Sequence, residues 1–330
     1  MRGAPRFPLT FGAYGRVGMT VVSTGSVAFD YILTFKGRFG DHILPGKTHI
    51  INLSFLVDTM VKRRGGVAGN YAYTLALLGH PAAVLATAGE DGADYKAWLE
   101  TLGVECGGLR LLPDEYTATG FSTHDLDDNH IWGYYGGAMW KAATLGLADT
   151  VADPEAVIVG PNAPEAMFRL VGECREAGVP WVFDPAHQLP HMSAADLEEG
   201  SRGAWVVIGN DYELELIRQR TGRDADSLLE LAEIVVTTLG REGSRIATRD
   251  GSFEIPAAPA RRELDPVGAG DAYRAGLVFG LLSGGGVARA GRIASLAGTY
   301  VVEETGTMEH RYTRDEFSER YQEVYGERPW

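Results

Sequence analysis

Strand-like and helix-like patterns alternate along most of the chain. Short apolar runs rich in β-branched residues predict buried strands at residues 20–26, 82–88, 156–160, 181–184, 204–210 and 234–240. Apolar residues spaced three and four apart predict helices at residues 66–79, 92–103, 164–178 and from Asp211 onward. The alternation predicts an α/β fold of three layers, in which helices cover both faces of a central, mostly parallel sheet. Ligands of such folds bind at the carboxyl ends of the strands.

Two segments break this alternation. Residues 31–62 and 115–136 contain short β-branched and aromatic runs separated by Gly, Pro and Asp–Asp–Asn turns. We interpret them as a small β-sheet lid inserted into one large domain, residues 19–330. Residues 1–18 contain arginines, prolines and glycines but no continuous apolar core, so we expect a disordered N-terminal extension rather than a signal peptide.

Charge and cysteine content narrow the function classes. The net charge is 30 − 44 = −14, which argues against sequence-independent nucleic-acid binding but leaves room for a small anionic ligand. No apolar run reaches the length of a membrane span. Two cysteines, Cys106 and Cys174, are too few for a disulfide framework and are typical of a cytoplasmic protein.

The stretch DPVGAGD, residues 265–271, places two glycines and an alanine directly before an apolar helical run. A helix N-terminus exposes unpaired N–H groups, and glycine lets them approach an anion closely. Asp271 would repel a phosphate unless it accepts a proton, so we interpret it as a general base. The alternative is a glycine-rich turn in which Asp271 only stabilises the first turn of the helix.

DPVGAGD resembles the D-T-x-G-A-G-D signature of the ribokinase-like (PfkB) sugar and nucleoside kinases, with Pro266 in place of the threonine. RGGVAGN, residues 64–70, resembles the family's early G-G-x-x-x-N block. TGSVAFD, NLSFLVD, DPAHQL and NDYELELI, among other stretches, look like the bacterial adenosine kinases of this family. The resemblance spans about residue 19 to the C-terminus.

The resemblance implies an ATP-dependent kinase that phosphorylates the 5′-hydroxyl of adenosine (ATP + adenosine → ADP + AMP), as in purine salvage. Asp271 would be the base, and the amides of Gly268, Ala269 and Gly270 would stabilise the transferred phosphoryl group. The implied ribose site consists of Ser26, Asp30, Gly66 and Asn70. For the nucleobase we selected Phe121, Met139 and Gln188, near Trp132 and Tyr135.

The same resemblance implies the nucleotide and cation sites. The ATP site would comprise Asn210, Thr238, Gly240, Gly243, Gly268 and Gly270, with small residues of 295–307 against the adenine. Asn210 and Glu213 would hold Mg²⁺ largely through water, although this spacing equally suits a helix cap. Asp265 would hold a monovalent cation such as K⁺. We also expect a homodimer formed through the lid, since pairing would shield its edges.

Two alternatives to an adenosine kinase stay open, and two further alternatives are disfavoured. A sugar kinase for ribose, fructose or a related furanose shares the base and the diol site, and only the pocket walls distinguish it. A broader nucleoside kinase differs only in base selectivity. A dinucleotide-dependent oxidoreductase is disfavoured because GSVAFD, not Gly-x-Gly-x-x-Gly, follows the first strand. A regulator that binds a nucleoside without catalysis is disfavoured by the presence of Asp271 and both cradle glycines.

Overall fold

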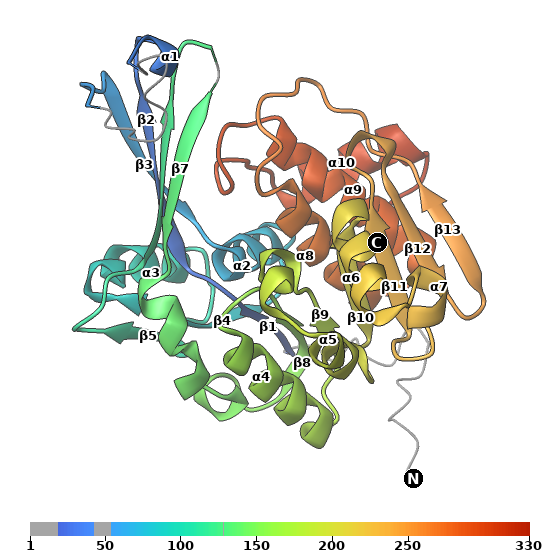
Figure 1. The fold of residues 1–330 in the computed structure, drawn as a ribbon. Coiled ribbons are helices and arrows are strands. Elements are labelled where there is room, and N and C mark those ends of the chain that lie inside the picture. The colour runs from blue at the N-terminus through green and yellow to red at the C-terminus, as the bar shows by residue number, and fades with distance from the viewer. Residues whose placement is uncertain (1–18, 43–53, 128) are drawn as a thin grey trace.

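The computed structural model describes residues 19–42, 54–127 and 129–330 (Figure 1). Within these ranges nine strands form a large sheet in the order β13-β12-β11-β10-β9-β8-β1-β4-β5. The strands from β11 to β5 are parallel, and β12 and β13 add an antiparallel hairpin at one edge. Their bounds are β1 Thr20–Thr24, β4 Ala82–Gly89, β5 Leu109–Leu112, β8 Pro154–Val159, β9 Trp181–Phe183, β10 Val206–Asn210, β11 Ile234–Thr238, β12 Ser244–Thr248 and β13 Gly251–Ile255.

Helices cover both faces of this sheet. They are α2 Val67–Leu77, α3 Ala93–Thr101, α4 Pro164–Ala177, α5 Ala194–Ser201, α6 Asp211–Thr221, α7 Ala225–Leu228, α8 Ala269–Leu282, α9 Val287–Val302 and α10 Arg314–Tyr325. The short helix α1 Phe39–His42 instead follows strand β2 of the second, smaller sheet (Figure 1). Short 3₁₀ segments occur at Glu90–Gly92, Gly137–Thr144, Leu147–Asp149, Ala186–His191 and Gly240–Glu242. No helix in the described part of the chain has the length and apolar character that a bilayer span requires.

The two faces of the sheet carry two separate cores. Successive residues of a strand point to opposite faces, so Val21 packs with α2, α8, α9 and α10 while Val22 packs with α4, α5 and α6. The same alternation separates Val206 from Val207 in β10. Because the central strands carry apolar residues on both faces, both layers of helices pack against a buried surface.

A second sheet of four strands projects from the large one (Figure 1). Its order is β3-β2-β6-β7, with bounds β2 Ala28–Thr34, β3 Thr59–Gly65, β6 Ala118–His124 and β7 His130–Tyr135. β2 continues almost directly from β1, and β3 leads directly into α2, so the small sheet is connected to the carboxyl edge of the large sheet at two points.

The predicted fold class, a three-layer α/β domain with a small second sheet, is confirmed. The predicted N-terminal extension, residues 1–18, and residues 43–53 within the first predicted lid segment lie outside the described residues. The sequence reading missed β5 and the antiparallel β12–β13 hairpin. β13 is almost fully exposed, and its side chains therefore show no core-facing pattern.

Candidate active site

The glycine-rich stretch forms the start of helix α8. Gly268 is the residue that precedes the helix, with a left-handed φ of 85°, and Asp271 lies in the first turn. A Cβ on Gly268 would lie 2.8 Å from Thr307 Cβ. Both the backbone angle and the close neighbour therefore require glycine here. Among the described residues the amides of Gly268 and Gly270 have no protein acceptor, as an anion cradle requires, whereas the Ala269 amide donates to the Pro266 carbonyl over 3.2 Å.

Asp271 is joined directly to the predicted ribose site. Asn70 in helix α2 donates from Nδ2 to Asp271 Oδ2 over 2.6 Å. Asn70 Oδ1 is buried and has no protein partner among the described residues, so one face of this amide remains available to a ligand. The structure thus brings together two predicted residues that are 201 positions apart in the chain.

Burial raises the pKa of the Asp271 carboxyl to about 6. The Arg274 guanidinium and the Asn70 hydrogen bond act in the opposite direction, whereas the charges of Asp184 and Glu213 raise the pKa further. A carboxylate with a pKa just below neutrality is mostly ionised at pH 7 and is still basic enough to accept a proton.

Asp184 and Arg274 form a buried ion pair beside this carboxylate, which the sequence analysis missed. Arg274 Nη2 donates to Asp184 Oδ1 over 2.8 Å, and its Nε lies 2.5 Å from Asp184 Oδ2. Tyr71 donates its hydroxyl to Asp184 Oδ2 over 2.6 Å. The available signal was Arg274 itself, the one charged residue within the apolar run 272–282.

The predicted sugar-binding residues Ser26 and Asp30 lie where β1 passes into β2. Ser26 is buried and accepts a hydrogen bond from the Val67 amide at 3.3 Å. Asp30 lies on β2, and burial raises the pKa of its carboxyl to about 6. Gly66 serves packing: a Cβ there would lie 2.5 Å from the Ser26 carbonyl oxygen. This packing requires glycine at the start of α2, and the expectation that Gly66 also presents backbone to the sugar stays a prediction.

The small sheet has two distinct faces at Asp30. Asp30 is paired with Gly120, and Gly120 with Tyr134, so these three residues share one face. A Cβ on Gly120 would lie 2.6 Å from the Trp132 ring, which places Trp132 on that face too. Phe121 is on the opposite face, where it stacks on Tyr31 with ring centroids 5.3 Å apart. The structure therefore does not bring Phe121 together with Asp30.

Met139 and Gln188, the other predicted base contacts, are both buried. Tyr134, which sequence reasoning missed, donates its hydroxyl to Met139 Sδ over 3.6 Å, which connects Met139 to the Asp30 face. Gln188 lies in the 3₁₀ segment after β9, four residues beyond Asp184. Its Oε1 is buried without a protein partner among the described residues, as expected of a side chain that contacts a ligand.

A cavity of about 590 Å³ lies on the other side of the α8 N-terminus. Four predicted ATP-site residues outside α8 line it, namely Asn210, Thr238, Gly240 and Gly243. Ala269, Gly270 and Asp265 form its end next to Asp271. Ser295, Gly298, Thr299 and Val302 of α9 form a wall, from the late helix whose small residues were expected to contact adenine. The volume is in the range that cofactor sites occupy.

Two polar side chains of α9 and Glu303, which directly follows this helix, hold the opposite wall of the cavity. Ser295 accepts from the Ala258 amide at 2.8 Å, and Thr299 donates to the Ala258 carbonyl over 3.1 Å. One turn further, Glu303 accepts from the Arg261 amide and pairs with Arg320 at 2.6 Å, and Arg320 donates to the Pro259 carbonyl over 3.1 Å. The four-residue spacing aligns these groups on one helix face, so the segment from Ala257 to Leu264 is fixed along its length.

Asn210 and Glu213, the predicted Mg²⁺ residues, form the cap of helix α6. Asn210 Oδ1 accepts from the Glu213 amide at 2.7 Å, and Glu213 Oε2 accepts from the Asn210 amide at 2.8 Å. Burial raises the pKa of Glu213. Asp265 accepts from the amides of Val267 at 3.0 Å and Gly306 at 3.1 Å, so its carboxylate joins the α8 approach to the segment after α9.

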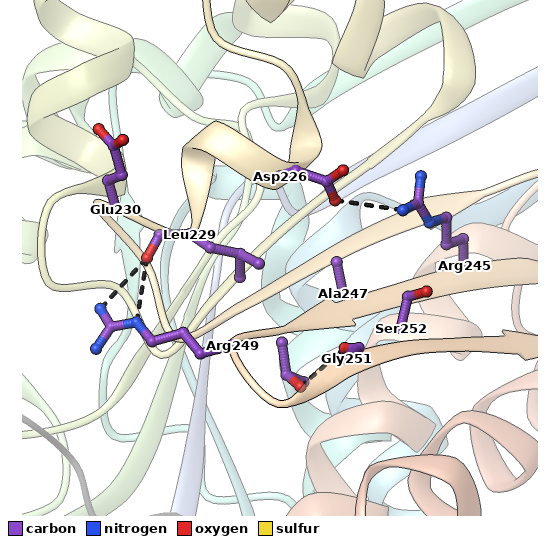
Figure 2. Close-up of a pocket in the computed structure, with 9 residues that line it drawn as sticks. Asp226, Leu229, Glu230, Arg245, Ala247, Arg249, Gly251 and Ser252 are labelled. Atoms are coloured by element: carbon purple, nitrogen blue, oxygen red, sulfur yellow. Dashed lines mark hydrogen bonds and ion pairs between the residues drawn. The ribbon is translucent and has the colours of Figure 1, made fainter.

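Another hollow, of about 690 Å³, lies between α7 and the β12–β13 hairpin (Figure 2). Its charged side chains already have partners within the protein. Arg249 donates to the Leu229 carbonyl, and Arg245 pairs with Asp226 at 3.3 Å. None of the predicted site residues lines it.

Comparisons with known proteins agree with this geometry. The model of the pfkB family carbohydrate kinases matches residues 22–313. A nucleoside kinase of Methanothermobacter thermautotrophicus is 31% identical over 313 residues, covering 94% of this chain and 97% of the relative. The solved structure of Burkholderia thailandensis nucleoside kinase in complex with inosine is 39% identical, with a TM-score of 0.83, and covers 94% of this chain and 99% of that one.

The fold and the α8 site define a ribokinase-like phosphotransferase that uses ATP and a hydroxyl acceptor. The chain belongs to the pfkB family of carbohydrate kinases. The family resemblance predicted from DPVGAGD and RGGVAGN is therefore confirmed.

Proposed function

We propose that the protein transfers the γ-phosphoryl group of ATP to the 5′-hydroxyl of a purine nucleoside, with adenosine as the expected acceptor. The observation that carries this proposal is the 2.6 Å hydrogen bond from Asn70 to Asp271. It connects the residues predicted to bind ribose with a base at the edge of the cavity predicted to bind ATP.

In the proposed reaction each group has a separate role. The Asp30 carboxylate accepts hydrogen bonds from the 2′- and 3′-hydroxyls, as one carboxylate can do for a diol. Asn70 orients both the sugar and the Asp271 carboxylate, which is the catalytic base. Asp271 accepts the 5′-hydroxyl proton as the oxygen attacks the γ-phosphorus, and ADP leaves. The amides at Gly268, Ala269 and Gly270 stabilise negative charge on the transferred group.

Mg²⁺ fits the acidic residues near the nucleotide cavity. Asp184, Glu213 and Asp271 gather around one guanidinium, which leaves the site with excess negative charge before ATP arrives. The described residues contain no group of three or more His, Cys, Asp or Glu side chains arranged to hold a metal. Magnesium that stays partly hydrated, held through water by Asn210 and Glu213, suits such a sparse set. When bound, it neutralises charge on the β- and γ-phosphates.

Asp265 is our proposed contact for a monovalent cation such as K⁺. Its two carboxylate oxygens each accept one amide and retain free lone pairs. Activity measured in K⁺, Na⁺ and tetramethylammonium buffers at equal ionic strength tests this role. Equal rates in all three would remove it.

A broader nucleoside kinase is the second candidate. It is supported by the similar proteins, which are described as nucleoside kinases, and by the inosine complex of the Burkholderia protein. The wall residues Trp132 and Tyr134 offer ring surface that stacks on any base. Gln188 is the side chain whose amide would read the base edge.

The deciding experiment measures ADP release from ATP and Mg²⁺ with adenosine, inosine, guanosine, cytidine, ribose or fructose, alongside Asp271→Asn. Mass spectrometry of the product identifies the phosphorylated hydroxyl. We expect preferred turnover of adenosine and loss of turnover in Asp271→Asn. Equal turnover of several nucleosides would favour the broader enzyme, and turnover of a free sugar alone would contradict the nucleoside assignment.

We also propose that two copies associate through the small sheet. Met60, Phe121, Ile131 and Tyr135 are all at least 47% exposed on it, which is unusual for side chains of this kind. Light scattering at working concentration tests this, and a mass equal to one chain would reject it.

A further inference from the structure

Arg274 on α8 contacts three separate elements of the candidate active site. Its side chain is 7% exposed, and its partner Asp184 is 1% exposed. Besides this pair, Nη1 donates to the Gly270 carbonyl over 3.0 Å, and Nη2 lies 3.6 Å from Glu213 Oε2. One guanidinium thus connects the end of β9, the first turn of α6 and the first turn of α8.

Gly270 leaves the space that the Arg274 side chain occupies. A Cβ on Gly270 would lie 2.8 Å from Arg274 Nη1. Any larger residue at position 270 would therefore displace the guanidinium from the Gly270 carbonyl. The second glycine of the GAG turn makes room for Arg274, in addition to any approach of a phosphate to the backbone.

Among the described residues, Arg274 is also the cation whose charge lowers the pKa of Asp271. The groups facing Asp271 are Arg274 on α8, Asn70 and Tyr71 on α2, Asp184 after β9 and Glu213 on α6. Asp184 and Glu213 oppose ionisation of Asp271, whereas Arg274 and the Asn70 amide favour it. Without Arg274, two acids would face the base with no cation between them.

We propose that Arg274 is a positioning residue for phosphoryl transfer, which fixes the first turn of α8 through the Gly270 carbonyl and places a positive charge beside the Asp271 carboxylate. This inference rests on the proposed role of Asp271 as the base. Arg274 touches neither reacting atom in this arrangement, and it acts through Gly270, Asp184 and Asp271.

Two substitutions of Arg274 separate its geometric role from its electrostatic role. Arg274→Gln removes both the positive charge and the planar guanidinium. The kcat should therefore fall at least about tenfold, and the acid limb of the pH profile should move up by about one pH unit. Arg274→Lys keeps the charge, so the acid limb should stay near that of the wild type. Its kcat should still fall, because an ammonium group cannot hold Asp184 and the Gly270 carbonyl in one planar geometry.

A double variant distinguishes a direct effect of Arg274 on kcat from an effect caused by lower stability. Arg274→Gln alone leaves Asp184 buried without its cation, which destabilises the fold. Asp184→Asn combined with Arg274→Gln removes both charges, so the melting temperature should recover relative to the single variant while kcat stays low. A kcat that recovers together with the melting temperature would reduce Arg274 to a structural residue.

Arg223→Gln is the matched control. Arg223 also joins two acids, Glu198 and Glu230, at 3.0 and 2.8 Å, but it lies near α5 and α7. This variant should lose stability and retain the wild-type pH profile. Asp271→Asn separates the role of Asp271 as the base from the role of Arg274. Activity retained in Asp271→Asn would reject Asp271 as the base. If Asp271→Asn is inactive while Arg274→Gln is folded and keeps the wild-type kcat and pH profile, only the inference on Arg274 is rejected.

Discussion

Asp30 and Gly120 face each other across β2 and β6, and a Cβ on Gly120 would lie 2.7 Å from Asp30 Oδ1. The same Cβ would lie 2.6 Å from the Trp132 ring. The absence of a side chain at position 120 therefore creates the space in which the Asp30 carboxylate and the indole lie together. Both are candidates to contact one nucleoside, Asp30 at the sugar and Trp132 at the base.

Gly120→Ala should weaken nucleoside binding because the new methyl displaces Asp30 or Trp132. We expect KM for the nucleoside to rise about tenfold, equivalent to about 1.4 kcal/mol, with KM for ATP unchanged. Gly133→Ala is the control, since a Cβ at this position in the same sheet meets nothing within 4 Å. Equal nucleoside KM values for the two variants would show that the space beside Asp30 is not used for substrate.

The two faces of the small sheet give a second prediction. Trp132→Ala should raise KM for the nucleoside about fivefold to twentyfold, because it removes an aromatic surface on the Asp30 face. Phe121→Ala should leave this KM unchanged, since Phe121 stacks on Tyr31 on the other face. Steady-state kinetics with both substrates varied distinguishes them. A larger effect of Phe121→Ala would place the nucleobase on the Phe121 face of the small sheet.

This difference shows where the sequence could and could not predict the site. A run such as GFSTH indicates a strand, but only its register against β2 decides whether Phe121 or its neighbours face Asp30, and a shift of one residue reverses the answer. Arg274 was hidden for a similar reason, since its partner Asp184 is 90 positions away. Asp271 could be selected as a candidate base from the sequence because the glycine turn and the acid lie within one short stretch.

The fold itself was more accessible to sequence reasoning. Buried parallel strands such as β8 and β10 are continuous apolar runs, and glycine follows helix α4 at Gly178 in the left-handed conformation. The β12–β13 hairpin lacks this signal because its outer strand faces solvent along most of its length. Edge strands are stabilised by backbone pairing more than by burial, so their side chains give little indication of structure.

The acid limb of the pH profile gives a third prediction. Burial raises the pKa of both Asp30 and Asp271 to about 6, and each must be ionised, one to accept ribose hydroxyls and one to accept the proton. Well below pH 6, kcat/KM for the nucleoside should therefore fall by about two powers of ten per pH unit. In Asp30→Asn the absolute activity should be lower, but the limb should fall only about tenfold per unit. A single-proton limb in the wild type would mean that one of these acids does not need to be ionised.

Gly268→Ala gives the fourth prediction, because it tests the anion cradle itself. The left-handed φ of 85° costs an alanine about 1–2 kcal/mol, and its Cβ would lie 2.8 Å from Thr307 Cβ, so the turn must shift. Misplacing one donor of an anion hole typically lowers kcat about 100-fold or more, and we expect a loss of this size with little change in nucleoside KM.

Gly222→Ala is the control for backbone strain in this test. Gly222 ends helix α6 with a left-handed φ of 73°, and a Cβ there meets nothing within 4 Å. Both variants should therefore lose stability through the same backbone conformation, measured as a lower melting temperature, while only Gly268→Ala should lose kcat. If Gly222→Ala reduced kcat as much, the loss would reflect general destabilisation, and the amides at the start of α8 would lose their assigned role.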